Sequence, residues 1–185
     1  YSASTWTGGP GTIYSMEATW DAIIEYQGIT FETDDDTGQS YALGRSVTFT
    51  DVTFTGNKCL VPTINSTFTV RRGTLTNCGI EADKLVGNFV LDDVTVRKVT
   101  FQSSSIKTAT FTDVTLTASL QGTPENFIGT RVISAAIRFG SDGYGASQTF
   151  TCAQCTFAEH LNDASAFENN IQTNYTLTDG ALCRP

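Results

Sequence analysis

The chain of 185 residues is long enough for one compact unit with a substantial apolar core. Charged residues make up only 16% of it, and the formal net charge at pH 7 is −8. An acidic surface repels phosphate backbones and anionic lipid headgroups, which argues against nucleic acids and membrane surfaces as partners. No apolar run approaches the about 18 residues of a membrane-spanning helix, which argues against membrane insertion.

Residues 1–45 form an N-terminal segment that precedes the repeats described next. Because the chain begins at Tyr1 without a methionine, we expect a signal peptide or upstream domains to precede it in the gene product. Apolar residues recur at helical spacing within the segment and alternate with acidic ones; they are Ile13, Met16, Trp20, Ile23 and Ile24. The end of a repeat array exposes a strand edge and part of its core, so we predict that this amphipathic helix is an N-terminal cap.

From residue 46 onward a short phrase recurs at a regular interval. Its five clearest copies are FTDVTF at Phe49, VRRGTL at Val70, LDDVTV at Leu91, FTDVTL at Phe111 and CAQCTF at Cys152. The start points step by 21, 21, 20 and 41 residues, so the last gap spans two periods. We place the missing copy at Val132–Ile137 and a seventh at Gln172–Leu177. A period of about 20 residues written in Thr, Val and Phe is typical of a β-solenoid, in which each repeat is one turn of a coil.

Three positions of the phrase are apolar and are predicted to face the core, as Phe49, Val52 and Phe54 illustrate. Two successive residues between them face outward, which indicates a bend between two short strands. The bend positions hold mainly polar residues that favour turns: Asp51, Arg72, Asp93, Asp113, Ser134, Gln154 and Asn174. The sequence therefore predicts one all-β domain over residues 46–185, a right-handed parallel β-helix of about seven coils.

Over about residues 46–180 these phrases resemble the right-handed parallel β-helix proteins of the pectin-lyase-like superfamily. That superfamily includes polysaccharide lyases, glycosidases, phage tailspikes and surface adhesins. The resemblance is one of repeat architecture, because the Gly-His-Gly and Arg-Ile-Lys segments of its glycosidases and the Arg/Pro segments of its lyases are absent from the chain. It therefore implies a fold rather than an activity.

Threonine flanks the inward residues in Thr-x-Thr pairs, which would stack into flat ranks of hydroxyl and methyl groups. The candidate binding residues are Thr48, Thr50, Thr53, Thr55, Thr67, Thr69, Thr74, Thr76, Thr110, Thr112, Thr115 and Thr117. Such ranks resemble the ice-binding faces of β-solenoid antifreeze proteins, although four residues are expected to interrupt them: Val90, Arg97, Arg131 and Arg138. Stacked threonine also makes an ordinary exposed parallel strand, so both interpretations stand.

The bend residues form a second candidate site. Stacked corners would place acidic residues and Arg72 in one outward file, with neighbouring coils about 4.8 Å apart. Paired carboxylates at such a distance suit acid–base hydrolysis of glycosides or, with Arg72 and Ca²⁺, lyase chemistry. The preference of Asp for turns and the neutralising charge of Arg72 account for the same pattern without catalysis. The catalytic candidates are Asp92, Asp93, Asp113 and Arg72.

The chain has five cysteines, an odd number that leaves at least one unpaired or bonded outside the chain. Cys59 and Cys78 are nearly one coil apart and are candidates for a disulfide between neighbouring coils. Cys152 and Cys155 occupy inward positions, which favours buried thiols or a local disulfide over a redox pair or a zinc site completed by His160 and Cys183. Disulfides would favour an oxidising compartment, where the sequons at Asn65 and Asn174 could be glycosylated.

We therefore expect a non-enzymatic extracellular module, secreted or on the surface of a cell or virus particle. Its partner would be an extended glycan or further copies of the same chain in a larger surface assembly, because solenoids offer long regular faces. No cofactor or metal is expected. The first alternative is an ice-binding protein that uses the Thr-x-Thr ranks. The second is a polysaccharide lyase or glycoside hydrolase that uses Asp92, Asp93 and Asp113.

Overall fold

The computed structural model describes residues 3–7, 23–32, 40–41, 45–55, 58–62, 66–82, 87–101, 106–122, 124–138, 149–160 and 175–178. All regular secondary structure within these ranges is β-strand. None of these residues belongs to a helix that is long and apolar enough to cross a membrane.

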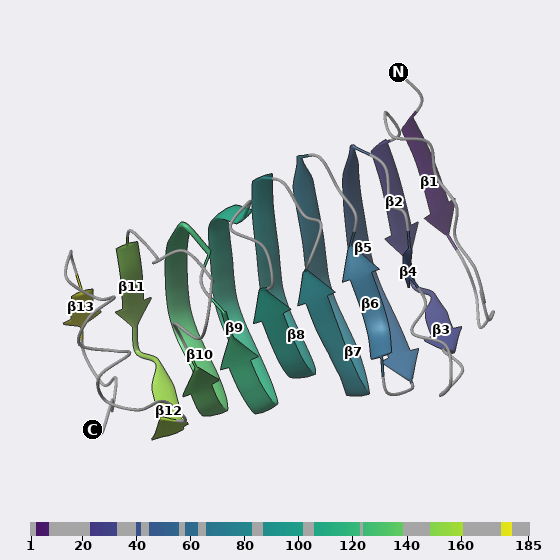
Figure 1. Ribbon diagram of the computed structural model, residues 1–185. Coiled ribbons are helices and arrows are strands. Elements are labelled where there is room, and N and C mark those ends of the chain that lie inside the picture. The colour runs from purple at the N-terminus through teal and green to yellow at the C-terminus, as the bar shows by residue number, and fades with distance from the viewer. Residues whose placement is uncertain are drawn as a thin grey trace.

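Thirteen strands make up this part of the chain. They are β1 (Ala3–Thr7), β2 (Ile23–Gln27), β3 (Thr30–Glu32), β4 (Ser40–Tyr41), β5 (Ser46–Thr55), β6 (Lys58–Pro62), β7 (Thr67–Ala82), β8 (Gly87–Phe101), β9 (Ile106–Gln121), β10 (Asn126–Arg138), β11 (Thr149–Ala153), β12 (Thr156–His160) and β13 (Tyr175–Thr178). Figure 1 shows them stacked side by side, with the long strands β7 to β10 curving around the coil. The main order is β1-β2-β5-β7-β8-β9-β10-β11-β13.

Each long strand pairs in parallel with the equivalent strand one turn further on. Val70 of β7 lies opposite Leu91 of β8, and Leu91 lies opposite Phe111 of β9, so the sequence period is the length of one turn. The predicted parallel β-solenoid is thereby confirmed. The structure shows about four turns rather than the seven predicted.

Every long turn has three sides, which β8 illustrates. Its residues 87–92 form the first side, 94–96 the second and 98–101 the third. Alternation within each side directs one set of side chains inward: Phe89 and Leu91 on the first side, Val94 and Val96 on the second, Val99 and Phe101 on the third. The predicted inward columns of Phe49, Val52 and Phe54 are confirmed in the same way by their burial.

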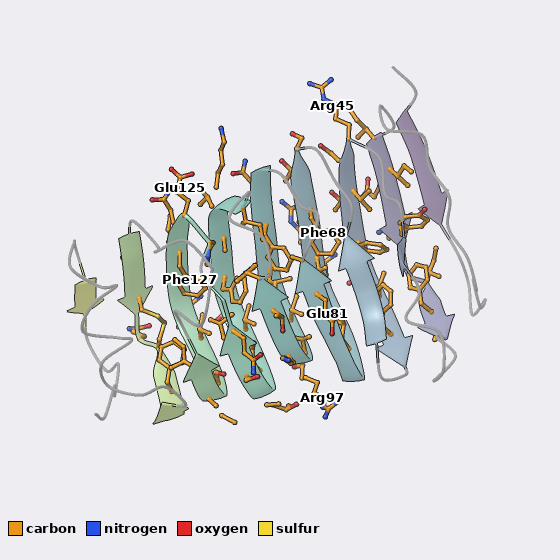
Figure 2. The ribbon with its side chains drawn as sticks, in the orientation of Figure 1. Arg45, Phe68, Glu81, Arg97, Glu125 and Phe127 are labelled. Atoms are coloured by element: carbon orange, nitrogen blue, oxygen red, sulfur yellow. A yellow bond between two sulfur atoms is a disulfide. The ribbon has the colours of Figure 1, made fainter. Side chains whose placement is uncertain are left out.

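Aromatic rings follow one another along the coil axis inside this core, in tilted or edge-on contact. Phe68 and Phe89 have ring centroids 5.1 Å apart, and Phe111 and Phe127 are also 5.1 Å apart. Figure 2 shows Phe68 and Phe127 among the side chains that fill the coil. Full burial of one such ring contributes about 1.5–3 kcal/mol, so the repeated Phe column is a major source of stability.

A left-handed residue joins the first and second sides within the long strands β7 to β10, within β5, between β2 and β3, and between β11 and β12. Its φ lies between 48° and 64° at Gly28, Asp51, Arg72, Asp93, Asp113, Arg131 and Gln154. A single αL residue turns the chain sharply, so that two successive side chains face outward, as the bend predicted from the sequence requires. Only Gly adopts this conformation without strain, yet most turns place a charged residue here.

The prediction for the coil of β10 was wrong by three residues. Gly129 of β10, not Val132, lies opposite Phe111 of β9, and Arg131 rather than Ser134 is the bend residue. Ser134 instead points inward and donates a hydrogen bond of 2.6 Å to the carbonyl of Ala136. The apolar residues between 132 and 137 fit the repeat in two registers, and only pairing with β9 decides between them.

The seventh phrase was also misplaced. Leu177 of β13 lies opposite Cys152, so it takes the first position of the phrase rather than the last. The bend position predicted at Asn174 lies outside the described residues.

The predicted N-terminal helix is not shown. Ile23 and Ile24 belong to β2, which pairs with β1 and β5, and Ile24 is buried while Ile23 is 44% exposed. That alternation has the period of a strand, and a short apolar run fits both periods until pairing partners are known. Ile13, Met16 and Trp20 lie outside the described residues.

Candidate functional site

A continuous row of threonines runs along the second side of the coil. The pairs Thr30–Thr53, Thr53–Thr74, Thr74–Thr95 and Thr95–Thr115 are each in direct register. We call these five residues the threonine file. Neighbouring strands of a sheet are about 4.8 Å apart, so the file repeats a hydroxyl and a methyl group at that interval. Thr74 and Thr95 are exposed, and the other three are partly exposed.

The threonine file stops at Thr115, because the next residue in register is apolar. Ile133 of β10 follows Thr115 in register and is 54% exposed, and Thr156 of β12 follows Ile133. Thr53, Thr74 and Thr115 are among the predicted binding residues, whereas Thr30 and Thr95 are not. Thr95 is followed by Val96 and Arg97, so it lacks the Thr-x-Thr spacing, and Thr30 precedes the first recognised phrase. Alignment of all turns on the bend residue would have identified both.

Thr55, Thr76 and Thr117 directly follow the second side in the chain, at the position that Arg97 holds after Val96 in β8. Thr117 is exposed, whereas the side chains of Thr55 and Thr76 are outside the described set. The predicted interruption at Arg97 therefore falls beside the threonine file and not within it.

The remaining predicted threonines lie on the first side of the coil: Thr48, Thr50, Thr67, Thr69, Thr110 and Thr112. Their files are mixed, because Val90 stands between Thr69 and Thr110, and Arg71 follows Thr50 in register. Thr50 and Thr69 are themselves buried. The predicted threonine ranks thus lie on two sides divided by the bend, and within the described strands only the second side carries an unbroken row.

The bend residues form a charged ridge between these two sides. Arg72 donates hydrogen bonds of 2.6 and 2.9 Å to the two carboxylate oxygens of Asp51 one turn earlier. Arg131 bonds both oxygens of Asp113 in the same way. These hydrogen bonds, aided by the arginine charges, hold the pKa values of Asp51 and Asp113 below their ordinary range. Arg131, predicted only as an interruption of the threonine ranks, is thus a partner of Asp113.

The structure brings the four catalytic candidates together on this ridge. Asp92 and Asp93 share one turn, with Arg72 one turn before and Asp113 one turn after. A general acid for glycoside hydrolysis needs a raised carboxyl pKa, whereas the pKa of Asp113 is lowered. The αL backbone and the pairs between arginine and aspartate explain these charged residues as a structural element of the turn.

The paired inward cysteines of the last phrase form a disulfide. Cys152 and Cys155 are bonded to each other on either side of the bend at Gln154, and both are fully buried. Gly129 leaves the space they need, because a Cβ atom there would lie 2.9 Å from the sulfur of Cys152. A small inward residue in β10 and a disulfide in the next turn therefore fill the core jointly.

The other predicted cysteine pair and the two sequons remain predictions. Cys59 and Cys78 lie in the paired strands β6 and β7, but their side chains are not among those described. The same is true of the His160 side chain, while Asn65, Asn174 and Cys183 lie outside the described ranges. Among the residues that are described, no three metal-ligating side chains cluster.

A pocket of about 300 Å³ opens near the second bend, where the second and third sides meet. Its lining includes Gly79 and Glu81 of β7, Arg97, Lys98 and Thr100 of β8, and Ala118 of β9. Figure 2 shows Arg97 projecting at the lower edge of the coil and Glu81 on β7 above it. None of these six residues was a predicted site residue.

Comparison with known proteins adds no family. No protein-family model, curated protein or solved structure matches the chain significantly. The class of protein is therefore defined by its architecture alone, as a parallel β-solenoid.

Proposed function

We propose that this protein is a non-enzymatic extracellular module that binds an extended, regularly repeating partner along the threonine file. The supporting observation is the register of five outward threonines on consecutive turns. A rigid sheet holds these hydroxyls at a fixed interval, so binding does not require them to be ordered first. Each hydroxyl can donate and accept a hydrogen bond, and each methyl group provides apolar contact.

The partner that fits this surface is a polymer with a repeated hydroxyl pattern, such as a glycan, or a further copy of the same face. The disulfide between Cys152 and Cys155 supports an oxidising compartment and hence a secreted or surface location. We also infer a right-handed coil like that of the pectin-lyase-like superfamily, because crossovers between parallel strands are almost always right-handed.

The test replaces Thr74 and Thr95 by tyrosine, separately and together, since both are exposed and central to the threonine file. Thr110→Tyr on the first side is the matched control. Binding is measured on a panel of neutral and charged polysaccharides, and self-association by sedimentation velocity. We expect binding or association in the native chain and in the control, and a loss of at least about tenfold in the file variants. A monomeric chain that binds no polysaccharide would contradict the proposal.

Ice is the second candidate partner, because the five threonines of the file follow one another in register without interruption. An ice face needs continuous rows of regularly spaced hydroxyl and methyl groups on a flat sheet, and the file supplies one such row. Thermal hysteresis that disappears in Thr74→Tyr and persists in Thr110→Tyr would establish this function. An absence of hysteresis at millimolar protein would reject it.

Catalysis is not proposed. Asp113 is bound by Arg131, and Arg72 is bound by Asp51, so two of the four candidates already have strong partners. Cleavage of a polysaccharide by the native chain that is lost in Asp93→Asn would instead establish an enzymatic function.

A further inference from the structure

The pocket at the second bend results from unequal turns in neighbouring coils. Leu75 and Gly79 of β7 lie opposite Val96 and Lys98 of β8, so three residues of β7 span the bend that one residue, Arg97, spans in β8. In β9 two residues span the same bend, since Leu116 and Ser119 are the partners of Val96 and Lys98. Stacked turns of different width leave a hollow, and Gly79 adds no side chain to fill it.

The lining of this hollow carries more positive than negative charge. Arg97 and Lys98 are consecutive cations in a chain with 11 basic and 19 acidic residues, and Glu81 supplies one carboxylate. Glu81 and Thr100 lie opposite each other in register, so they share one part of the pocket. The site therefore has a cationic part and a part with a hydroxyl and a carboxylate.

Thr100 has the only buried side-chain oxygen or nitrogen without a hydrogen-bond partner among the described residues. Buried hydroxyls normally have a partner, so this oxygen marks a place where a ligand group would complete the structure. Threonine has alternative staggered rotamers, so the hydroxyl can turn toward a ligand while the strand stays in place.

We propose that this pocket binds a small hydroxylated oxyanion, a molecule that carries a phosphate, sulfate or carboxylate group beside one or more hydroxyls. Arg97 and Lys98 bind the oxyanion by charge-assisted hydrogen bonds. Glu81 accepts a hydrogen bond from a ligand hydroxyl, and Thr100 bonds to the same part of the ligand. A volume of about 300 Å³ is at the lower end for small-molecule sites, which limits the ligand to about the size of one sugar.

This site is independent of the threonine file, because its lining contains none of the five file residues. The oxyanion can come from a free metabolite or from a charged group on a polymer, which present the same chemistry. Glucose 6-phosphate represents the free ligand, dextran sulfate the polymer, and glucose and dextran are their uncharged counterparts.

Binding is followed by titration calorimetry and by amide chemical shifts of Gly79, Lys98 and Thr100 in the whole chain. We expect glucose 6-phosphate, dextran sulfate or both to bind and to shift these amides, and glucose and dextran to have no effect. Arg97→Gln and Lys98→Gln should each weaken binding about tenfold, as expected for loss of a charge-assisted hydrogen bond. Gly79→Leu should block the pocket without removing a charge.

Lys107→Gln is the matched control, since Lys107 is an exposed lysine of β9 outside the pocket lining. Circular dichroism confirms that each variant folds. The proposal is overturned if neither charged probe binds at millimolar concentration. It is also overturned if Lys107→Gln weakens binding as much as Lys98→Gln, or if Gly79→Leu binds like the native chain.

Discussion

Arg72 and Asp51 lie at the bends of adjacent turns and join them by two hydrogen bonds, 2.6 and 2.9 Å long. Both residues have the left-handed backbone conformation, with φ of 48° and 54°. Arg131 and Asp113 repeat the arrangement further along the coil. The bend thus combines a strained backbone with ion pairs between turns, and its two components can be tested separately.

The ion pairs should make stability depend on pH in the acid range. The pKa values of Asp51 and Asp113 are lowered in the folded chain. In the acid range the folded chain therefore binds fewer protons at these two carboxylates than the unfolded chain does. Their contribution is therefore fully present above about pH 4, the unfolded pKa of Asp, and is lost as pH falls through the lower folded values. Melting temperatures at decreasing pH should fall less steeply for Arg72→Gln/Arg131→Gln than for the native chain. Identical pH profiles would show that the pairs contribute nothing.

The backbone strain should appear at Asp93, which has φ of 55° and a place on the ridge between Arg72 and Asp113. A β-branched residue tolerates this conformation poorly, so Asp93→Val should destabilise the fold by about 1–2 kcal/mol. Asp93→Gly should cost little or stabilise, because Gly adopts positive φ freely. Asp92→Gly is the control, since φ at Asp92 is not positive, and there Gly should cost about 0.5–1 kcal/mol. Denaturant unfolding that ranks the two glycine variants in the opposite order would refute this account.

The aromatic column should carry a large share of stability. Phe89 is fully buried, with ring centroids 5.1 Å from Phe68, 5.2 Å from Phe101 and 5.8 Å from Phe111. Phe89→Ala should therefore cost about 3–5 kcal/mol in chemical denaturation. Thr95→Ala, at an exposed position of the next side, should change stability by less than about 0.5 kcal/mol. A small effect at Phe89 would mean that the coil collapses around the missing ring.

Gly129 and the disulfide should be energetically coupled. A Cβ at Gly129 would approach the sulfurs of Cys152 and Cys155 to 2.9 and 3.2 Å, so Gly129→Ala should destabilise by about 1–3 kcal/mol. In a Cys152→Ala/Cys155→Ala background the same change should cost less, because the two sulfur atoms are gone and only the ring of Phe127, 3.0 Å from the added Cβ, still opposes it. A double-mutant cycle measures this coupling. Additive effects would show that the disulfide does not occupy the space that Gly129 leaves.

Much of one turn could be predicted from sequence because its determinants are local. Alternation assigned Phe49, Val52 and Phe54 to the core, and the two outward residues between them located the bend at Asp51. The period of about 20 residues predicted parallel stacking. The inward positions of Cys152 and Cys155 in one phrase likewise predicted either buried thiols or a local disulfide, and the structure shows the disulfide.

The relation between turns was less accessible, because it depends on pairing over a whole coil. The shift that places Gly129 rather than Val132 opposite Phe111 could be decided only by contact with β9 and by the space that the disulfide fills. The strand at Ile23 likewise required β1 and β5 as partners before its period was clear.

The sequence by itself therefore determined that this protein is a parallel β-solenoid with a Phe, Val and Leu core and a polar bend, since side-chain alternation is a property of the local chain. Only the tertiary structure decided which residue of one turn lies beside which residue of the next. It joined Thr30 and Thr95 to the threonine file, paired Arg131 with Asp113, and formed a charged pocket from bends of unequal length. These features depend on register between turns, which is set by packing across the coil and not by the spacing within a phrase.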